Sequence, residues 1–197
     1  DGHFYIAEAL KRGASGIVAN PKYISGNLLK QKFPRILVPD PNMALIDWAS
    51  DYRKHFKGKV IAITGSNGKT TTKDILSFFC RYIDPRTSST PGNYNNYIGV
   101  SITLLNSDLE AQWWVVEIGT NHFGEIADLS NIVKPSAGII TNIGESHLEF
   151  LKNTEGVAIE KSGLFLGMSH GDNVVIPHSI MHKKLIETEA KNNGIKI

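Results

Sequence analysis

A glycine-rich segment joins a short apolar run to a stretch whose apolar residues have helical spacing. It follows the run at 60–64 and reads Thr64-Gly65-Ser66-Asn67-Gly68-Lys69-Thr70-Thr71. Glycines let the backbone wrap a phosphate with its N–H groups, and the start of a helix adds positive potential. In such a loop Lys69 reaches the β- and γ-phosphates, and the Thr70 hydroxyl binds Mg²⁺. The segment therefore predicts a nucleotide site formed by Gly65, Ser66, Asn67, Gly68, Lys69, Thr70 and Thr71.

The loop departs at one place from the general phosphate-loop pattern G-x-x-x-x-G-K-[ST], because Ile63 stands where its first glycine belongs. A glycine-rich turn with an incidental lysine is the simpler alternative, but the strand expected before the loop and the helix expected after it favour phosphate binding. By itself the loop does not choose among kinases, ATPases and ligases.

The elements around this loop alternate between strands and helices. Apolar runs predict strands at 60–64, 113–118, 137–141 and 173–176, and helical spacing predicts helices at 69–82, 124–133, 155–166 and 179–192. Such alternation favours the α/β class, with a mostly parallel sheet flanked by helices. Ligands of such sheets bind at the carboxyl ends of the strands, and the motifs described below fall at those ends.

A smaller α/β unit is expected before the loop. Its predicted elements are a helix at 5–12 that Gly13 ends, strands at 16–19 and 36–38, and a helix at 42–56. Lys57-Gly58-Lys59 then reads as a linker, which places a domain boundary between 1–57 and 58–197. The chain begins at Asp1 without a methionine and ends where a strand begins, so we expect a fragment of a longer protein.

Composition limits the class of protein. The 197 residues are 41% hydrophobic and 20% charged, with a formal net charge of +2, which is ordinary for a globular protein and gives no basic footprint for nucleic acid. Cys80 is the single cysteine, so an internal disulfide and a thiolate metal cluster are both excluded. We expect Cys80, Trp113 and Trp114 to serve packing. No apolar run is long enough to span a bilayer, and we expect a cytoplasmic monomer without membrane insertion.

Several further segments resemble one family in order and spacing. The loop T-G-S-N-G-K-T-T resembles the variant found in Mur ligases and in their relative folylpolyglutamate synthase. The segments at 90–100, 117–126, 141–149 and 160–165 resemble the motifs G-N-x-N-N-x-I-G-V, E-[LM]-G-[AT]-[SN]-H-x-G-E-I, T-N-[IV]-G-x-x-H-L-E and K-x-x-[IL]-F of the Mur ligases that add D-alanyl-D-alanine. Asp1-Gly2-His3 resembles the end of the domain that holds the UDP moiety. Two departures are Ser101 and Phe123, where proline is common in the family.

The resemblance implies a carboxylate-activating amide ligase of peptidoglycan precursor synthesis. Its expected substrates are ATP, UDP-N-acetylmuramoyl-tripeptide and D-alanyl-D-alanine. The tripeptide carboxylate would attack the γ-phosphate to give an acyl phosphate, and the amine of D-alanyl-D-alanine would displace phosphate. Catalysis is then mostly positioning and charge neutralisation.

The resemblance also divides the chain by function. It implies the end of a small N-terminal UDP-substrate domain at 1–57 and an incomplete ATP-binding central domain at 58–197. The C-terminal domain that closes on the nucleotide would lie outside the chain. We therefore expect this piece alone not to catalyse the reaction.

The same resemblance assigns roles outside the loop. Glu117 resembles a Mg²⁺ ligand, and a lone acid inside an apolar run needs a partner. His147 resembles the residue that helps hold a second Mg²⁺, although imidazole is not a preferred ligand of that ion. Lys161 resembles the lysine that the family carries as a carbamate, formed with CO₂, whose oxygens suit Mg²⁺. The expected catalytic residues are thus Lys69, His147 and Lys161, and the expected metal ligands are Thr70, Glu117, His147 and Lys161.

Amide and imidazole side chains complete the predicted site. Asn93, Asn95 and Asn96 are expected to contact substrate, because three asparagines in four positions exceed what a turn needs. His122 is a further contact candidate. Lys161 has an alternative as a surface lysine paired with Glu160 or Glu155 on the helix expected at 155–166.

Two other functions stay open at this point. One is a related ligase, either a sister Mur ligase that adds another amino acid or folylpolyglutamate synthase, and the Gly-Asn-Tyr-Asn-Asn loop at 92–96 discriminates against both. The other is a nucleotide-binding module that does not catalyse. A domain of more than 100 residues encoded downstream of Ile197 would favour the ligase.

Overall fold

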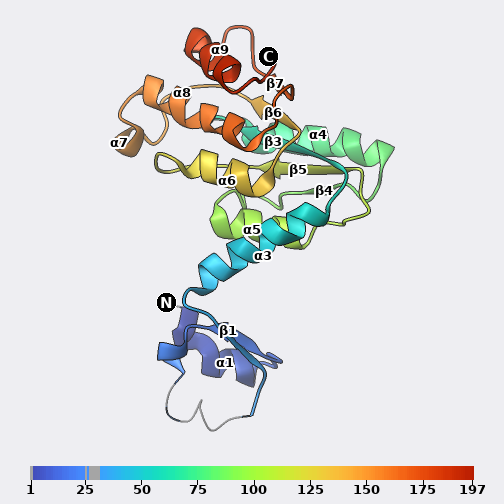
Figure 1. Ribbon diagram of the computed structural model, residues 1–197, viewed down its shortest axis with the longest axis vertical. Coiled ribbons are helices and arrows are strands. Elements are labelled where there is room, and N and C mark those ends of the chain that lie inside the picture. The colour runs from blue at the N-terminus through green and yellow to red at the C-terminus, as the bar shows by residue number, and fades with distance from the viewer. Residues whose placement is uncertain (1, 25, 27–31) are drawn as a thin grey trace. The chain divides into compact units, whose positions relative to one another are not determined.

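The computed structural model describes residues 2–24, 26 and 32–197. The chain divides into two compact units, 1–47 and 48–197, and each is described by itself (Figure 1). Asp1, the first residue of the Asp-Gly-His motif, lies outside the described residues.

The first unit packs a short helix against two short strands. Its elements are η1 (Gly2–Tyr5), α1 (Ile6–Lys11), β1 (Ile17–Ala19), η2 (Pro21–Tyr23), β2 (Arg35–Leu37) and the first turns of α3 (Pro41–His55). β1 and β2 pair in parallel, with Ile17 opposite Arg35. The small core consists of Ile6, Ala19 and Ile24. The positions of α1, β1 and β2 confirm the predicted helix and both predicted strands of this unit.

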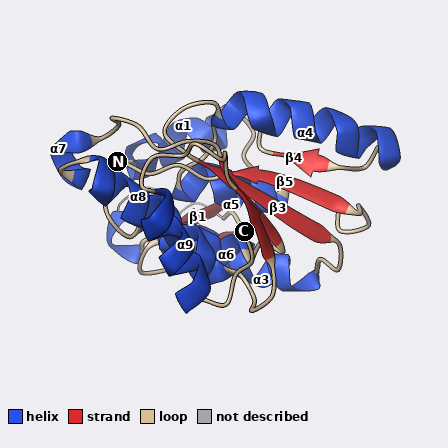
Figure 2. Ribbon diagram, turned by 90° about the horizontal axis from the view of Figure 1, so that it is seen from above, coloured by secondary structure: helices blue, strands red, loops and turns tan. Residues whose placement is uncertain are grey.

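The second unit is a five-stranded parallel sheet in the order β4-β5-β3-β6-β7. Its strands are β3 (Lys59–Thr64), β4 (Ser88–Ser89), β5 (Trp113–Glu117), β6 (Ala137–Ile140) and β7 (Asn173–Val175). Its helices are α4 (Lys69–Ile83), α5 (Tyr97–Leu105), α6 (Glu125–Val133), α7 (Leu148–Leu151), α8 (Thr154–Ser162), η3 (Gly163–Gly167) and α9 (Lys183–Asn192). Figure 2 shows α4 on one side of the sheet and α5 and α6 on the other. The predicted α/β class with a mostly parallel sheet is confirmed.

Alternate residues of the central strands pack on opposite faces of the sheet. Val60, Ala62 and Trp114 belong to the large core beneath α5 and α6, whereas Ile63 and Val115 pack with Cys80 of α4 on the other face. The ring of Trp114 stacks on Phe56 at 3.8 Å between centroids. The expected packing roles of Cys80 and Trp114 are therefore confirmed, and Trp113 is half-buried at the edge of the smaller cluster.

The division between the two compact units falls within α3. The last turns of α3 belong to the second unit, because Ala49 and Phe56 are buried in its core. Tyr52 donates a hydrogen bond to the Ser107 carbonyl at 3.0 Å, and Arg53 donates to the Val133 carbonyl at 2.6 Å. The compact division thus falls between Asp47 and Trp48. The assignment of 1–57 and 58–197 to functional domains stays a prediction.

Glycines explain where one predicted helix breaks. The helix expected at 155–166 ends at Ser162 and continues as the 3₁₀ segment η3. Gly167 lies so close to α6 that a side chain there would overlap the Ser130 backbone, and Gly163 lies against Ala127. The tighter 3₁₀ winding accompanies this close approach.

No helix within the described residues is long and apolar enough to cross a membrane.

Candidate functional site

The parallel sheet brings the predicted motifs to one edge. Register pairs Ile63 with Glu117 and Thr64 with Ile140, so β3, β5 and β6 end side by side. The phosphate loop follows β3, Glu117 ends β5, and the segment at 141–147 follows β6. This edge is where ligands of parallel sheets are expected.

The phosphate loop has the backbone that its glycines permit. Gly65 and Gly68 adopt φ values of +141° and +78°, which side chains disfavour, and a Cβ on Gly65 would overlap the Thr141 hydroxyl. Lys69 Nζ folds back to donate hydrogen bonds to the carbonyls of Gly65 at 2.9 Å and Ser66 at 3.3 Å. Burial lowers the pKa of Lys69, while the Glu117 carboxylate acts in the opposite direction. The lysine is held beside the loop that it is predicted to serve.

The segment after β6 supports the loop from the other side. The Asn67 backbone N–H donates to the Asn142 side-chain oxygen at 2.8 Å, and the Thr141 hydroxyl donates to the Asn67 carbonyl at 2.6 Å. The Gly144 N–H donates to Ser66 Oγ at 3.0 Å. These contacts fix the loop before any ligand binds. Sequence reasoning missed them, since they join residues more than seventy positions apart.

Glu117 is a buried carboxylate with two side-chain donors. Its exposed fraction is 1%. Thr70 Oγ1 donates to Oε2 at 2.8 Å, and Asn95 Nδ2 donates to Oε1 at 2.7 Å. The partner that a lone buried acid requires is thus present, and Glu117 and Thr70 meet as predicted.

The donors at Glu117 and Thr70 fit Mg²⁺. A carboxylate and a hydroxyl are the hard oxygen ligands that this ion prefers, and Mg²⁺ commonly combines one or two carboxylates with phosphate oxygens of a nucleotide. Among the described residues no cluster of three or more His, Cys, Asp or Glu side chains is arranged for a metal ion. A Mg²⁺ ion that arrives with a nucleotide would suit the Glu117 and Thr70 donors.

A cavity of about 160 Å³ lies beside the loop. It is lined by Lys69, Asn95, Asn96, Tyr97, Gly119, Thr120, Asn121, Glu125, Leu129 and His147. His147 adopts a left-handed backbone with φ of +52°. Burial, followed by the positive charges of Lys161 and Lys69, lowers the pKa of His147, which favours the neutral imidazole.

Lys161 lies in the last turn of α8 and is 1% exposed. Burial, reinforced by the charge of Lys69, lowers the pKa of Lys161 to about 8, although Glu160 and Glu125 oppose this. The alternative of a surface lysine paired with Glu160 is wrong. The Glu160 carboxylate instead accepts hydrogen bonds from the backbone N–H groups of Gly124 at 2.7 Å and Ile126 at 2.8 Å.

The three asparagines have different surroundings. Asn95 holds Glu117, as described above. Asn96 caps α5, its side-chain oxygen accepting from the Gly99 N–H at 2.9 Å, and Asn93 is exposed. Asn95 and Asn96 line the cavity and Asn93 does not. Substrate contact by these side chains stays a prediction.

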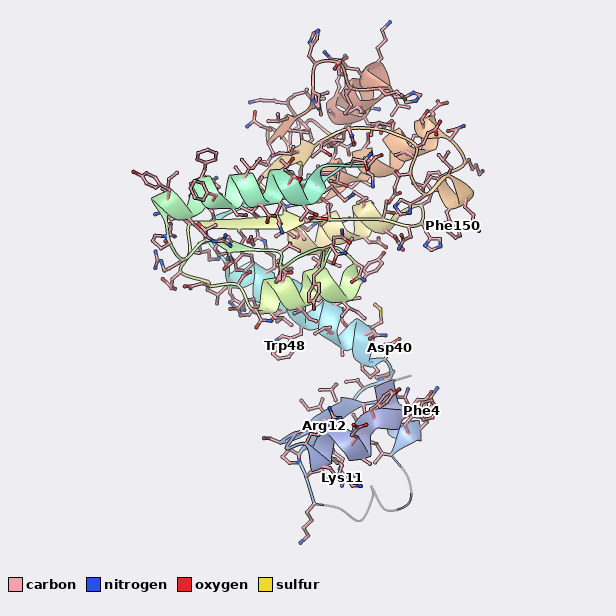
Figure 3. All side chains as sticks on the ribbon, turned by 180° about the vertical axis from the view of Figure 1, so that it is seen from behind. Phe4, Lys11, Arg12, Asp40, Trp48 and Phe150 are labelled. Carbon is pink, nitrogen blue, oxygen red and sulfur yellow. The ribbon has the colours of Figure 1, made fainter. Side chains whose placement is uncertain are left out.

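His122 lies outside the set of residues that line the cavity. Its Nδ1 is 3.3 Å from Glu125 Oε1, and its ring lies 4.2 Å from that of Phe150, which is exposed on α7 (Figure 3). Glu125, which sequence reasoning did not single out, also accepts from the Asn121 N–H at 2.6 Å. Burial acts to raise the pKa of Glu125, but hydrogen bonds from the Asn121 and His122 backbone outweigh it and hold the pKa below its ordinary value.

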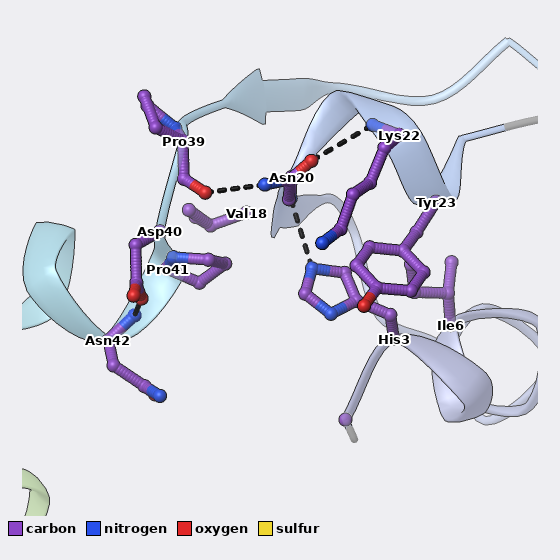
Figure 4. Close-up of a pocket in the computed structure, with 11 residues that line it drawn as sticks. His3, Ile6, Val18, Asn20, Lys22, Tyr23, Pro39, Asp40, Pro41 and Asn42 are labelled. Carbon is purple, nitrogen blue, oxygen red and sulfur yellow. Dashed lines mark hydrogen bonds between the residues drawn. The ribbon is translucent and has the colours of Figure 1, made fainter.

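The first unit has a separate cavity of about 560 Å³ (Figure 4). His3 accepts a hydrogen bond at Nε2 from the Asn20 N–H at 3.0 Å and stacks on Tyr23 at 4.1 Å between centroids. Lys22 Nζ lies 4.8 Å from the centre of the Tyr23 ring. Aromatic faces, amides and a positive charge thus line one space, which suits an anionic ligand with a planar ring.

Known proteins match both this fold and these motifs. The family described as Mur ligase middle domain matches residues 63–197. A UDP-N-acetylmuramoyl-tripeptide--D-alanyl-D-alanine ligase of Rickettsia prowazekii is 38% identical over 176 residues, which make up 89% of this chain and 38% of the relative. Crystal structures of MurF from Acinetobacter baumannii and of MurF from Thermotoga maritima in complex with ADP give TM-scores of 0.87 and 0.83 at 31% and 29% identity.

Both structures are matched over 100% of this chain, which covers 42% and 43% of theirs. The chain therefore spans about two fifths of the length of the proteins that it matches. The family match covers more than half of the chain. This chain belongs to the Mur ligase family, and its residues 63–197 match the middle domain of that family.

Proposed function

We propose that the protein containing this chain is an ATP-dependent ligase of peptidoglycan precursor synthesis that joins D-alanyl-D-alanine to UDP-N-acetylmuramoyl-tripeptide. The observation that carries the proposal is the pairing of the phosphate loop with a buried acid, Thr70 Oγ1 lying 2.8 Å from Glu117 Oε2. The Rickettsia prowazekii relative is named for this reaction. ATP, UDP-linked precursor and a cytoplasmic location follow from that activity.

The proposed reaction has two steps. A carboxylate oxygen of the tripeptide attacks the γ-phosphorus of ATP, the bond to the bridging oxygen breaks, and ADP leaves with formation of an acyl phosphate. The amine of D-alanyl-D-alanine then attacks the acyl carbon, phosphate leaves, and the amine loses a proton to give the amide. Both steps bring anionic groups together, so positioning and charge neutralisation dominate the barrier.

Residues of the loop supply much of that neutralisation. The backbone N–H groups at 65–71 would hold the phosphates, and Lys69 would exchange its hydrogen bonds to Gly65 and Ser66 for phosphate oxygens. Glu117 and Thr70 would hold Mg²⁺. Bound there, the ion would offset the negative charge of the phosphates.

Lys161 is proposed to act as a carbamate. Its neutral amine would attack the carbon of CO₂, and loss of one proton would leave an anion with two oxygens. Near-complete burial and a pKa lowered to about 8 support this reaction, because they favour the neutral amine. The unmodified ammonium does not fit a second Mg²⁺, whereas carbamate oxygens beside His147 do.

The cavity of the first unit is proposed to hold the UDP end of the precursor. The stacked pair of His3 and Tyr23 offers an aromatic face to a base, and Lys22 offers charge to a diphosphate (Figure 4). This role extends the resemblance of the Asp-Gly-His segment to the domain that holds UDP in the family.

The direct test is phosphate release by the intact protein with ATP and Mg²⁺. The proposal expects release that needs both UDP-N-acetylmuramoyl-tripeptide and D-alanyl-D-alanine, with little release when either is omitted. Release that follows a different amino acid would identify a sister ligase. Nucleotide binding without release under any of these conditions would identify a non-catalytic module.

A further inference from the structure

Lys73 is a buried lysine that the proposed chemistry does not use. It lies one turn after Lys69 on α4 and is 3% exposed. Its Nζ donates to the carbonyls of Thr90 at 2.9 Å and Gly92 at 3.1 Å, and it lies 2.9 Å from Asp74 Oδ1. An ammonium has three donors, and each has an acceptor here. Lys73 therefore joins α4 to the loop at 90–92 and has no free donor for a ligand.

The loop that Lys73 holds leads to Glu117. Thr90 Oγ1 accepts a hydrogen bond from the Glu117 backbone N–H at 2.9 Å. Asn95, further along the same loop, donates from Nδ2 to Glu117 Oε1 at 2.7 Å and accepts from the Gly119 N–H at 2.8 Å through its carbonyl. The loop thus contacts Glu117 at both its backbone and its carboxylate.

These contacts close a ring. Thr70 and Lys73 are three positions apart on α4, so they lie on neighbouring parts of one helix face. Thr70 approaches Glu117 directly at Oε2, whereas Lys73 approaches it through the loop and Asn95. The carboxylate is therefore held on both oxygens from the same helix, and its direction depends on both connections.

We propose that Lys73 is a positioning residue for Glu117. By holding the loop at 90–92, it keeps Asn95 against the carboxylate, so that Glu117 presents its oxygens beside Thr70 in the orientation a nucleotide-bound Mg²⁺ requires. The inference rests on the proposed use of Mg²⁺ and ATP at this site. Partners that orient metal ligands commonly change metal affinity or activity by about 10- to 100-fold when they are removed.

A matched control lies on the same helix. Arg81 holds the same connecting segment further from Glu117, donating from Nη2 to Ser89 Oγ at 2.6 Å and from Nε to the Thr87 carbonyl at 3.4 Å. If Lys73 had a purely structural role, replacing it would have the same kind of effect as replacing Arg81. Replacing either residue would then reduce stability without a specific effect on the metal.

The test measures the dissociation constant of a non-hydrolysable ATP analogue with and without Mg²⁺, for the intact protein and its variants. The ratio of the two constants gives the contribution of the metal. We expect Lys73→Met and Asn95→Ala each to reduce this ratio about tenfold or more. The dissociation constant without Mg²⁺ should stay within about twofold of that of the unaltered protein, because the phosphate loop is unchanged. Arg81→Met should leave the ratio within about twofold.

A double variant tests whether both residues act along one path. Lys73→Met combined with Asn95→Ala should lose no more of the ratio than either alone, since the second change removes a contact already released. A multiplicative loss would contradict the path through Asn95 and overturn the inference.

An unchanged ratio in Lys73→Met, or an equal loss in Arg81→Met, would also overturn it. If Lys73→Met does not fold, Lys73→Leu, which also lacks a donor for the loop carbonyls, is measured in its place, and an unchanged ratio there has the same meaning. An unaltered protein that binds the analogue equally with and without Mg²⁺ would overturn the proposed metal use together with this inference. The two failures are therefore distinguishable.

Discussion

The nucleotide side of the candidate site and the exposed contact between His122 and Phe150 are built differently. On the nucleotide side, Thr70 Oγ1 donates a hydrogen bond to the buried Glu117 carboxylate, and the half-buried Lys69 donates to the Gly65 carbonyl. On the exposed side, His122 and Phe150, neither of which lines the cavity, meet near the surface through a tilted ring contact. His147 and Lys152 at the two ends of α7 adopt left-handed backbones with φ of +52° and +69°, which non-glycine residues disfavour.

We expect the nucleotide side to carry out the chemistry with groups held in place, and the exposed side to adapt to a substrate. A phosphoryl-transfer site gains from donors and acceptors that are already in place, and the nucleotide side has them. Both side chains of the contact between His122 and Phe150 are exposed, so we expect this side to be the more adaptable one. Changes on the first side should therefore alter turnover, and changes on the second side should alter substrate affinity.

The largest effect is expected from Lys69→Ala in the intact protein. Removing this charge takes away stabilisation of the transferring phosphoryl group, so kcat should fall about 10³-fold or more. Steady-state ADP formation measures this loss. Near-normal turnover would show that the phosphate loop does not serve ATP.

Lys161→Ala should lower turnover about 10²-fold or more, because it removes the carbamate oxygens. Added formate or acetate should restore part of the rate by occupying the vacated anionic position. Lys191→Ala, on the exposed surface of α9, provides the control. Full activity of Lys161→Ala would refute a role for this lysine, and inactivity without rescue would contradict the carbamate.

The unmodified Lys161 should also make stability depend on pH. Its pKa falls from 10.5 to about 8 in the folded state, so the unfolded chain binds more protons between those values and stability rises with pH across that window. The penalty is fully present below pH 8 and amounts to something on the order of 3 kcal/mol.

Lys161→Met should therefore be more stable than the unaltered protein at pH 7, with the difference shrinking toward pH 10.5. Urea unfolding in CO₂-free buffer measures it, with Lys191→Met as the control. A difference that is constant from pH 7 to 10.5 would contradict the lowered pKa.

The smallest effect is expected from Phe150→Ala. Its ring contact with His122 at 4.2 Å is exposed, and such a contact is worth about 0.5–1.5 kcal/mol. The KM for the tripeptide or for D-alanyl-D-alanine should rise by about two- to tenfold at unchanged kcat. Phe78→Ala on the exposed face of α4 is the matched control. A large loss of kcat in Phe150→Ala would show that this side takes part in the chemistry.

Local patterns predicted four of the five strands and most helices of the second unit, together with the phosphate loop, but missed the short strand β4. These features depend on apolar spacing, glycine positions and helix starts, all of which the sequence displays. The helix α5 was missed, because Gly99 and four β-branched residues within it weaken the helical pattern. The residue that could have indicated this helix is Asn96, its N-cap, which was predicted to contact substrate instead.

Contacts between residues far apart in the sequence limited how much of the candidate site could be predicted. Glu117 was predictable as a lone acid in an apolar run, whereas the role of Asn95 as its donor depends on how β5 meets the loop before α5. Lys73 gave no signal, since a lysine four positions after Lys69 is ordinary on a helix surface. Its burial follows from the approach of the loop at 90–92 to α4, which no local pattern encodes.

The central claim, an acyl phosphate formed from the tripeptide carboxylate, has one direct measurement. The intact protein is given UDP-N-acetylmuramoyl-tripeptide whose terminal carboxylate oxygens are both ¹⁸O, with ATP, Mg²⁺ and D-alanyl-D-alanine, and the released phosphate is analysed by mass. The oxygen that attacks the γ-phosphorus leaves with phosphate when the amine attacks the acyl carbon. The account predicts one ¹⁸O in each phosphate released with product, and unlabelled phosphate accompanying amide formation would contradict it.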